Sequence, residues 1–368
     1  MSLRSLLALE IVTALAVIGA GALLWQESPR LVSSHERDAP IFPELAETQS
    51  QVDALEIETR DYRLKLRRSG EGWVASSQAD YPIRAEAATT LIADIAALRK
   101  VEPKTSKPEW FPLIGVEDRG IEGARSRLVR LHSGDDVLAQ LLVGKVSTSM
   151  GADLIGGTFV RVPGEVQSWL ASGLVEIPPV QQAWFGELFD IQGPELRRIS
   201  IREGDEVVFD AKRDSESAAY ELVSYAPAYA EEGASIKVNL LQRLARVLVS
   251  TPLSSARPAA DVTRPADART VTFETASGLS LEARIAEVDG APWVLFHAEA
   301  ADGSDAEALA AEITKRTERW AFRLPNEYTL ALMTNVKDLL TKEEAAPPAN
   351  GMGQIITDPS IFLQGQSN

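Results

Sequence analysis

The sequence predicts an α+β protein that consists of tandem duplicated repeats of antiparallel sheet with covering helices, preceded by one N-terminal transmembrane helix. A unit of roughly 145 residues occurs twice along the chain. Strand-length runs of alternating apolar and polar residues dominate both copies, and each copy also contains an amphipathic helical run. The first residues of the chain form a long apolar segment. These three observations together predict the fold class.

The two copies keep the same order of elements. Leu55-Glu56-Ile57 matches Ile199-Ser200-Ile201 at an offset of 144 residues (199 − 55), and the next strands match at 145 (209 − 64). The helical runs match at 149 (240 − 91), which makes Ile95 and Leu244 equivalent. Two later strand pairs match in the same order: Leu128–Leu131 with Thr270–Phe273, and Phe159–Val162 with Trp293–Phe296. A true duplication predicts equal strand orders in the two copies, whereas chance alternation in a β-rich chain, the alternative, does not.

The segment from Leu6 to Trp25 is almost wholly apolar, and its 20 residues would form a helix about 30 Å long, enough to cross a bilayer. We therefore predict that residues 1–26 are a single-pass anchor in a bacterial inner membrane, with the bulk of the chain in the periplasm. A cleaved secretory signal is the alternative, because Ala20-Gly21-Ala22 has the form of a cleavage site. The chain has no cysteine, which excludes a lipoprotein anchor and thiolate metal sites.

The remaining chain is predicted to divide into four parts, set by composition and by proline-rich joints. These are a linker at 27–50, a first α+β repeat at 51–178, a second α+β repeat with a C-terminal helix at 179–342, and a disordered tail at 343–368. Pro178-Pro179 marks the joint between the repeats. Beyond Lys342 the chain becomes polar and rich in proline and glycine, which is typical of disorder.

Helices are predicted from apolar stripes and from capping residues. In the first repeat, Glu86 to Lys100 is expected to cover the sheet, and Val166 to Leu170 to form a short helix. In the second repeat, the capping pattern from Ser304 to Glu307 starts a helix. A last helix begins at Pro325 and is expected to carry its apolar residues on one face: Leu330, Met333, Val336, Leu339 and Leu340.

The sequence contains no pattern that predicts a reaction centre. His35, His132 and His297 lack the spacing of metal ligands, and the Gly-x-Ser-x-Gly motif of serine hydrolases is missing. Gly144-Lys145-Val146-Ser147 resembles the end of a phosphate-binding loop, but position 139 is Ala where that loop needs glycine. We therefore predict no catalytic, cofactor-binding or metal site. The net charge of −16, from 37 basic and 53 acidic residues, disfavours nucleic acid as a partner.

Large aromatic side chains are the remaining candidates for contact with other molecules. Trp73 is expected to pack in the core of the first repeat. Trp184-Phe185 and Trp320 follow the two repeats at comparable places. They are predicted either to pack at the domain joints or to contact a partner protein.

Several motifs resemble those of DUF4340, an uncharacterised bacterial domain-of-unknown-function family. They are the N-terminal anchor, Gly70 to Trp73, Tyr81-Pro82, Ile114-Gly115-Val116, Leu142 to Lys145 and Thr158 to Arg161, and the resemblance covers most of residues 50–340. Members of that family are membrane-anchored proteins often encoded beside the permease and auxiliary subunits of gliding-motility-type ABC transport systems. The resemblance implies a cellular neighbourhood and no reaction, and it carries no catalytic residue onto this chain.

Two functional hypotheses and a remote third follow from the sequence. The first is a non-catalytic, membrane-anchored periplasmic accessory or scaffold protein associated with an ABC-type transport or envelope complex. The second is a periplasmic ligand-binding or sensing protein that uses a cleft between the repeats. An enzyme of unknown class is the third.

Overall fold

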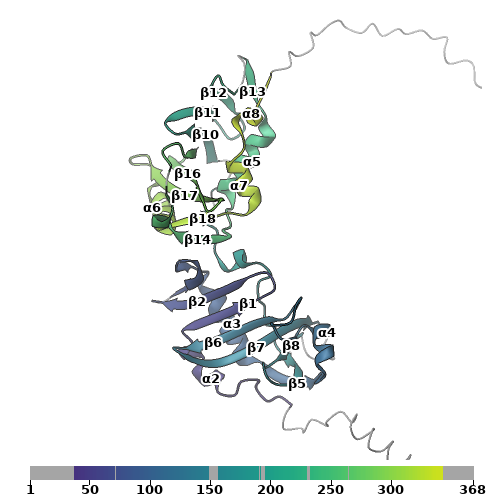
Figure 1. Ribbon diagram of the computed structural model, residues 1–368. Coiled ribbons are helices and arrows are strands. Elements are labelled where there is room, and N and C mark those ends of the chain that lie inside the picture. Colours follow the sequence, from purple (N-terminus) through teal and green to yellow (C-terminus); the bar gives the residue numbers. More distant parts are fainter. Residues whose placement is uncertain are drawn as a thin grey trace, which may run out of the picture. The chain divides into compact units, whose positions relative to one another are not determined.

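The computed structural model describes residues 37–342, apart from residues 71, 149–155, 190, 192–194, 230–232 and 264. The chain divides into two compact units, residues 1–186 with 252–257 and residues 187–251 with 258–368. Each unit contains an antiparallel sheet and a few helices, so the predicted α+β class is confirmed (Figure 1). The predicted anchor and tail lie outside the described residues. Within the described part of the chain, no helix has the length and apolar character that a membrane span requires.

The first unit is built on a nine-stranded sheet of order β4-β3-β2-β1-β6-β7-β8-β9-β5, in which neighbouring strands are antiparallel. Its strands are β1 (Ala54–Glu58), β2 (Arg63–Ser69), β3 (Gly72–Ala75), β4 (Tyr81–Pro82), β5 (Arg99–Pro103), β6 (Arg127–Ser133), β7 (Asp136–Ser147), β8 (Gly157–Arg161) and β9 (Ser168–Ser172). Its helices are α2 (Leu45–Thr48), α3 (Ala85–Ala97) and α4 (Phe111–Ile114), with short 3-10 turns η1 (Gln49–Gln51), η2 (Ser76–Gln78), η3 (Pro108–Trp110) and η4 (Gln181–Trp184).

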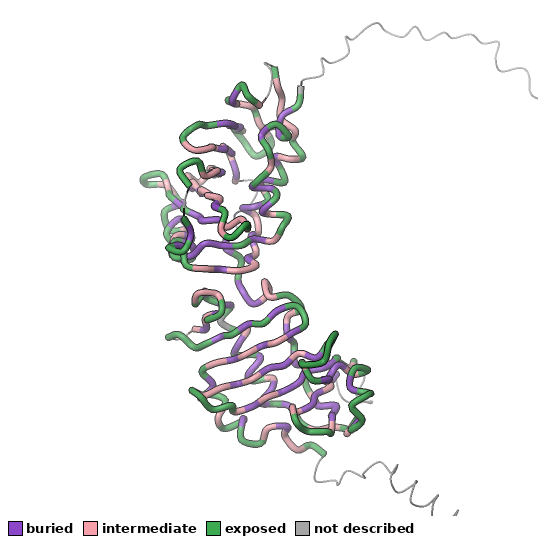
Figure 2. The backbone as a smooth tube through the Cα atoms, in the orientation of Figure 1, coloured by how far each residue is buried: buried purple, intermediate pink, exposed green. Residues whose placement is uncertain are grey.

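The core of the first unit follows the alternation of its strands. Leu55 and Ile57 in β1 and Leu64 and Leu66 in β2 are buried, while the residues between them are partly or fully exposed (Figure 2). Trp73 is 3% exposed, as the sequence predicts. Helix α3 buries its apolar stripe, and it packs against β3 and against the α2–η1 turn. This burial of one helix face against a sheet is the ordinary basis of a two-layer domain.

Residues 37–50, expected to belong to a linker, are instead part of the first unit. The Ile41 amide donates to the Leu98 carbonyl at 2.9 Å, and the Lys100 amide donates to the Ala39 carbonyl at 2.8 Å. Leu45 in α2 is 1% exposed. Because apolar side chains at 41 and 45 complete the core beside α3, this segment is held in place despite its prolines.

The second unit is built on an eight-stranded sheet of order β12-β11-β10-β15-β16-β17-β18-β14 and a two-stranded sheet, β13-β19. The strands of these two sheets are β10 (Leu196–Glu203), β11 (Glu206–Lys212), β12 (Glu221–Tyr225), β13 (Ala234–Ile236), β14 (Ser255–Pro258), β15 (Arg269–Thr275), β16 (Leu279–Val288), β17 (Ala291–Ala300), β18 (Trp320–Arg323) and β19 (Leu340–Lys342). Residues 255–257 of β14 are counted with the first unit in the division given above. The helices of the second unit are α5 (Val238–Val249), α6 (Glu307–Thr317), α7 (Asn326–Leu332) and α8 (Val336–Leu339), with the 3-10 turn η6 (Ala259–Asp261).

The two large sheets have the same strand order when β10 is matched with β1 and the other strands follow along the chain. The registers agree as well: Leu55 pairs with Leu66 and Leu131, and Ile199 pairs with Ala211 and Phe273. These are the pairings that the sequence offsets predict. Ile95 and Leu244 are 1% and 0% exposed on α3 and α5. The sheets differ at one edge, because β4 extends the first sheet whereas β13 pairs with β19 instead.

Two of the predicted helices are wrong. The short helix expected at Val166 to Leu170 is strand β9, which pairs with β8 and β5. Residues Ser168 to Ala171 of β9 are all buried, on both faces of the strand, and so short a stretch without alternation has no period that separates strand from helix. The C-terminal helix is broken into α7 and α8, because Asn335 starts α8 with its side chain accepting from the Lys337 amide at 2.9 Å. Leu330 and Met333 are 68% and 49% exposed, outside the expected apolar face.

Candidate binding groove in the first unit

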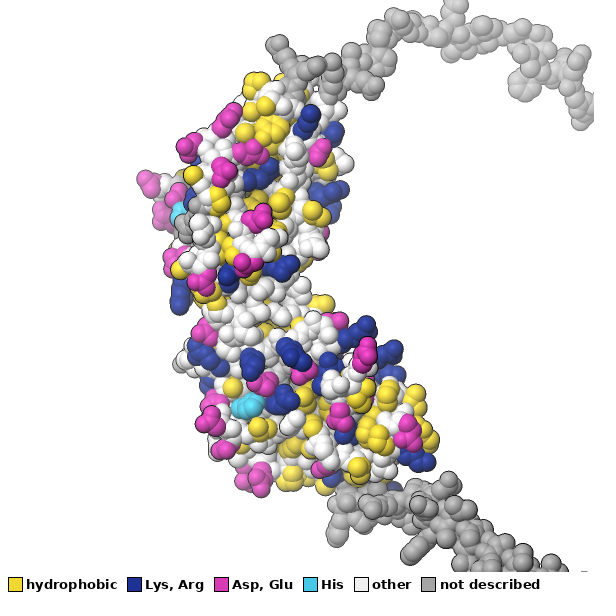
Figure 3. Space-filling view, in the orientation of Figure 1, with side chains coloured by type: hydrophobic (Ala, Val, Ile, Leu, Met, Phe, Trp, Pro, Cys, Tyr) yellow, Lys and Arg dark blue, Asp and Glu magenta, His cyan; other side chains and the backbone are white. Residues whose placement is uncertain are grey.

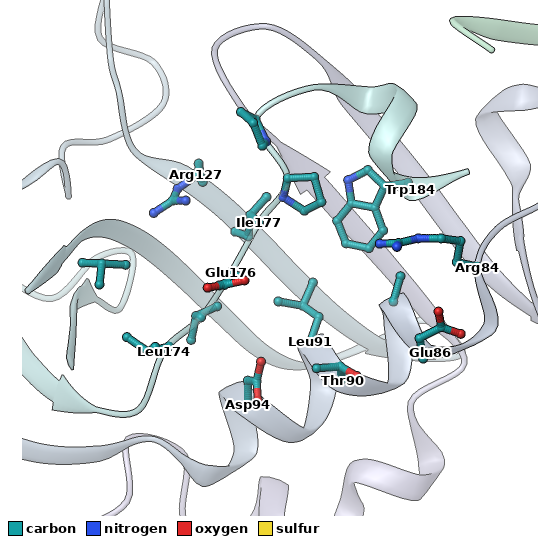
Figure 4. Close-up of a pocket in the computed structure, with 15 residues that line it drawn as sticks. Arg84, Glu86, Thr90, Leu91, Asp94, Arg127, Leu174, Glu176, Ile177 and Trp184 are labelled. Carbon is teal, nitrogen blue, oxygen red and sulfur yellow. The ribbon is translucent and has the colours of Figure 1, made fainter. Parts of the chain in front are cut away.

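An open groove of about 640 Å³ lies in the first unit between α3 and the segment 174–184, which follows β9 (Figure 4). Leu91, Ile177 and Trp184 line its apolar part, and Arg127, Asp94 and Glu176 are among its charged residues. Its size falls within the range of ligand pockets, which is about 300–1,000 Å³.

Helix α3 presents one side to the groove because residues three or four apart lie on the same helix face. Leu91 and Asp94 come from successive turns of that side, while Glu176 and Ile177 reach the groove from the facing segment (Figure 4). The backbone amide of Arg84, just before α3, donates to the Trp184 carbonyl at 3.1 Å. The amino end of α3 is thereby attached to the far end of segment 174–184.

Tyr62 fixes the same segment from the sheet side. Its hydroxyl donates to the Pro178 carbonyl at 2.7 Å and accepts from Trp184 Nε1 at 2.9 Å. Burial raises the pKa of Tyr62 to about 12. The hydroxyl therefore stays protonated at neutral pH and keeps both hydrogen bonds, which hold residues 178–184 in a defined course beside the groove.

The aromatic residues singled out as possible partner contacts are buried. Trp184 is 1% exposed, Phe185 4% and Trp320 7%. Phe185 packs edge to face on Tyr81, with ring centroids 5.9 Å apart. Their burial leaves little surface for a partner, and Trp184 also forms part of the groove wall, while packing at the domain joint and contact with a partner both stay predictions.

Arg127, the first residue of β6, brings a half-buried cation to the groove. Its Nη2 donates to the carbonyl of Gly144, and among the described residues its guanidinium makes no ion pair with a carboxylate. Burial lowers its pKa, with only Tyr62 acting in the opposite direction. An arginine whose charge is partly desolvated without a carboxylate partner is an energetic cost to the fold.

Gly144 is required by packing rather than by a phosphate. A Cβ at this position would meet the carbonyl of Ile114 and would lie 2.8 Å from Cγ1 of Val116. Only glycine lets β7 approach the turn after α4 so closely. The same turn is tied down by Arg161, whose Nε donates to the Val116 carbonyl at 2.9 Å. The motifs Ile114-Gly115-Val116 and Leu142 to Lys145 are therefore two sides of one packing contact.

Two carboxylates also line the groove, Asp94 from α3 and Glu176 from the facing segment (Figure 4). Asp94 projects from α3, and its pKa is raised, first by burial and then by the nearby charge of Glu176 (Figure 4). This pair can accept hydrogen bonds from N–H groups or attract a cation. On the face shown in Figure 3, basic and acidic side chains are interspersed over both units. Within the described residues, no group of three or more potential ligands from His, Cys, Asp and Glu could hold a metal ion.

The second unit has an arginine at the position of Arg127. In the second sheet, Arg269 of β15 pairs with Glu203 of β10, next to the pair Arg202–Thr270. That pair matches Glu58–Leu128 in the first sheet, so Thr59 and Arg127 match Glu203 and Arg269. Arg269 Nη1 lies 3.1 Å from Glu203 Oε1, and its Nε donates to the Leu332 carbonyl at 3.0 Å. Its Nη2 donates to the Thr334 carbonyl. Both carbonyls belong to the α7–α8 segment, which packs on α5.

The sequence reading missed Arg127 and Arg269, although the signal was present. The strand match of Leu128–Leu131 with Thr270–Phe273 places the two arginines side by side in the alignment, each one residue before the matched run. Comparison of the chain with family models, with curated proteins and with solved structures finds no significant match. The resemblance to DUF4340 therefore stays a prediction.

Proposed function

We propose that this protein is a non-catalytic accessory or scaffold protein of the bacterial envelope, and that its first unit binds a partner protein through the groove beside α3. One observation carries the proposal. The second unit packs its own α7–α8 segment on α5, and Arg269 binds the end of α7, whereas in the first unit an open groove lies beside α3 and Arg127. The arginine of the second unit is satisfied by that unit's own chain, whereas the arginine of the first unit lies at an open groove. This difference supports a binding role for the groove.

We also infer that the two units are tandem duplicated repeats. The common strand order and the common registers support this inference, because unrelated sheets of eight or nine strands would rarely agree in both. After a duplication, one copy is free to keep a closed, structural form while the other retains a binding surface.

The proposed setting is a bacterial inner membrane, with residues 1–26 as a single-pass anchor and the two units in the periplasm. The apolar run from Leu6 to Trp25 supports the anchor, and the resemblance to DUF4340 suggests ABC transporter permease or auxiliary subunits as partners. A reporter that is active only in the periplasm, fused after Lys342, should be active. Activity of a cytoplasmic reporter at the same place would reverse this orientation.

A second candidate function is the binding or sensing of a small ligand in the same groove. The volume of about 640 Å³ and the mixture of apolar walls with a few charged groups favour it. The two candidates differ in what occupies the groove. They therefore predict that different molecules, a partner protein or a small ligand, co-purify with the chain.

Purification of the full chain from its native membranes in mild detergent separates the two candidates. The accessory-protein proposal predicts stoichiometric co-purification of at least one other protein, identified by mass spectrometry. Native mass spectrometry of the same sample reports any bound small molecule. A protein that comes out alone, carrying a small molecule, would establish the second candidate in place of the first.

A further inference from the structure

We infer that Arg127 anchors a partner polypeptide by binding free backbone carbonyls at the carboxyl end of a helix, together with one carboxylate. This inference rests on the proposed function, because it specifies the chemistry of the segment that the groove would take. Its basis is the arginine at the matching position of the second unit, whose partners among the described residues are given above.

Arg269 shows what this position accepts when it is satisfied. The guanidinium binds the carbonyls of Leu332 and Thr334, at and just beyond the end of α7, and pairs with the carboxylate of Glu203. The last carbonyls of a helix have no partner within the helix, and they carry the negative end of its dipole. A cation with several donors in a planar fork therefore suits such a helix end.

Arg127 has the same place in its sheet but lacks these partners. Thr59 stands where the second unit has Glu203, so no carboxylate faces Arg127 across the strands. The hydroxyl of Thr59 is used in a local turn, where it accepts from the Tyr62 amide at 3.0 Å. Arg127 is left with the Gly144 carbonyl, although a guanidinium has five N–H donors. The carboxylate that Glu203 supplies in the second unit must here come from the occupant.

The rest of the groove defines the occupant further. Val146 and Leu174, which are 45% and 39% exposed, offer apolar surface to side chains of the incoming helix. Asp94 and Glu176 repel a second anionic group, which argues against a polyanion and favours N–H donors or a cation beside them. The segment that fits is an amphipathic helix end with one acidic residue for Arg127 and a basic or amide group for the two carboxylates.

Site-specific photo-crosslinking in the full-length protein tests this inference. A photoreactive residue in place of Leu174, which is 39% exposed at the groove, would be activated in native membranes. The crosslinked partner peptide would then be identified by mass spectrometry. The experiment is repeated in Arg127→Gln, in Arg127→Lys and in Arg130→Gln. Arg130 lies on the same strand but pairs with Glu56 at 3.3 Å, outside the groove, which makes it the matched control.

We expect one partner peptide, from the carboxyl end of a helix and with an acidic residue. Arg127→Gln should lower its yield at least about tenfold, because truncating one member of a charged contact weakens binding strongly. Arg127→Lys should retain part of the yield, and Arg130→Gln all of it. An equal yield in Arg127→Gln would overturn the inference, as would a peptide without an acidic residue or a crosslink to residues 343–368 of the chain itself.

The same data distinguish this inference from the proposed function. If a partner co-purifies and its crosslink at position 174 has the same yield in Arg127→Gln as in the unchanged protein, the accessory role stands and the arginine anchor is wrong. If no protein co-purifies and none crosslinks in the groove, both the anchor and the accessory role are wrong. Thermal unfolding of each variant shows whether a lost crosslink reflects an altered fold, and Arg127→Lys is the second variant for that case.

Discussion

The two units differ most in how they treat the same arginine. In the second unit Arg269 is enclosed by Glu203 and by the end of α7. In the first unit Arg127 has neither partner and lies at an open groove. The strand order and registers around the two residues are the same. The sheet therefore places an arginine at the same position in both units. The segments that connect the strands determine whether its donors are satisfied inside the fold.

Another pair of matching positions has been kept for packing. Arg68 lies over the ring of Trp73 at 5.4 Å, and Arg213 lies over the ring of Tyr220 at 5.0 Å. The registers of β2 with β3 and of β11 with β12 place the two rings at equivalent points. Trp73 is buried and Tyr220 is half-buried. The interaction between cation and ring is therefore common to both units, while the depth of burial is not.

The largest effect is expected from Trp73→Ala, which should lower the free energy of unfolding of the first unit by about 3–5 kcal/mol. Tyr220→Ala should cost the second unit only about 1–2 kcal/mol, because its ring is less buried. Urea unfolding of the full chain, followed by probes in each unit, measures both values. Two units can unfold separately, so the two transitions are fitted independently. Equal costs would mean that burial does not distinguish the two positions.

The next effect concerns the two arginines. Arg269→Gln removes an ion pair and two hydrogen bonds to carbonyls, so it should destabilise the second unit by about 2–4 kcal/mol. Arg127→Gln removes a partly desolvated charge without a carboxylate partner, so it should change the stability of the first unit by less than about 1 kcal/mol. The same unfolding experiment, without any partner protein, compares them. A loss above about 2 kcal/mol for Arg127→Gln would make this residue structural and would weaken the binding proposal.

Most of the sheet could be predicted from the sequence, and the groove could not. Alternation fixes which residues of β1 and β2 are buried, and the offsets of 144 and 145 reproduce the observed registers. The buried residues of β9 do not alternate with exposed ones, so its sequence does not separate strand from helix until its two neighbouring strands are known. The alternation of apolar and polar residues within a strand is a local property of the chain, which is why the sequence reveals which strand residues are buried.

The groove depends on tertiary contacts that periodicity does not contain. The course of residues 178–184 is set by Tyr62, which lies 116 residues away from Pro178 in the sequence. The partners of Arg269 come from α7, which the sequence predicts only as part of a longer helix. Asparagine is a common N-cap, but Asn335 lies inside an apolar helical pattern, so the sequence does not show that it ends one helix and starts α8.

A smaller effect is expected from Gly144→Ala. The added Cβ has no room beside Ile114 and Val116, so the turn after α4 must move, at a cost of about 1–3 kcal/mol. The pairs Leu128–Leu142 and Thr270–Arg284 match, so Gly144 corresponds to Ala286 in the second unit, where the Cβ packs in the core. Gly72→Ala is the control in the same sheet, because its nearest neighbour beyond the adjacent residues would be 3.9 Å away. Unfolding that is equally unaffected in both variants would contradict the close approach.

The smallest effect is a dependence of stability on alkaline pH that is specific to the groove side of the first unit. Burial raises the pKa of Tyr62 from 10.0 to about 12, so below pH 10 the hydroxyl is protonated in both folded and unfolded chains. Between these two pH values Tyr62 ionises mainly in the unfolded chain, and the folded state loses about 2 kcal/mol of stability as the pH rises.

Tyr62→Phe lacks this loss, but it also lacks the hydrogen bonds to Pro178 and Trp184, which costs about 1–2 kcal/mol at neutral pH. The stabilities of the two proteins should therefore converge as the pH rises from about 9 to about 11.5, measured by urea unfolding. A constant difference over that range would show that the hydroxyl is not buried, and the segment beside the groove would then be held by the ring of Trp184 rather than by Tyr62.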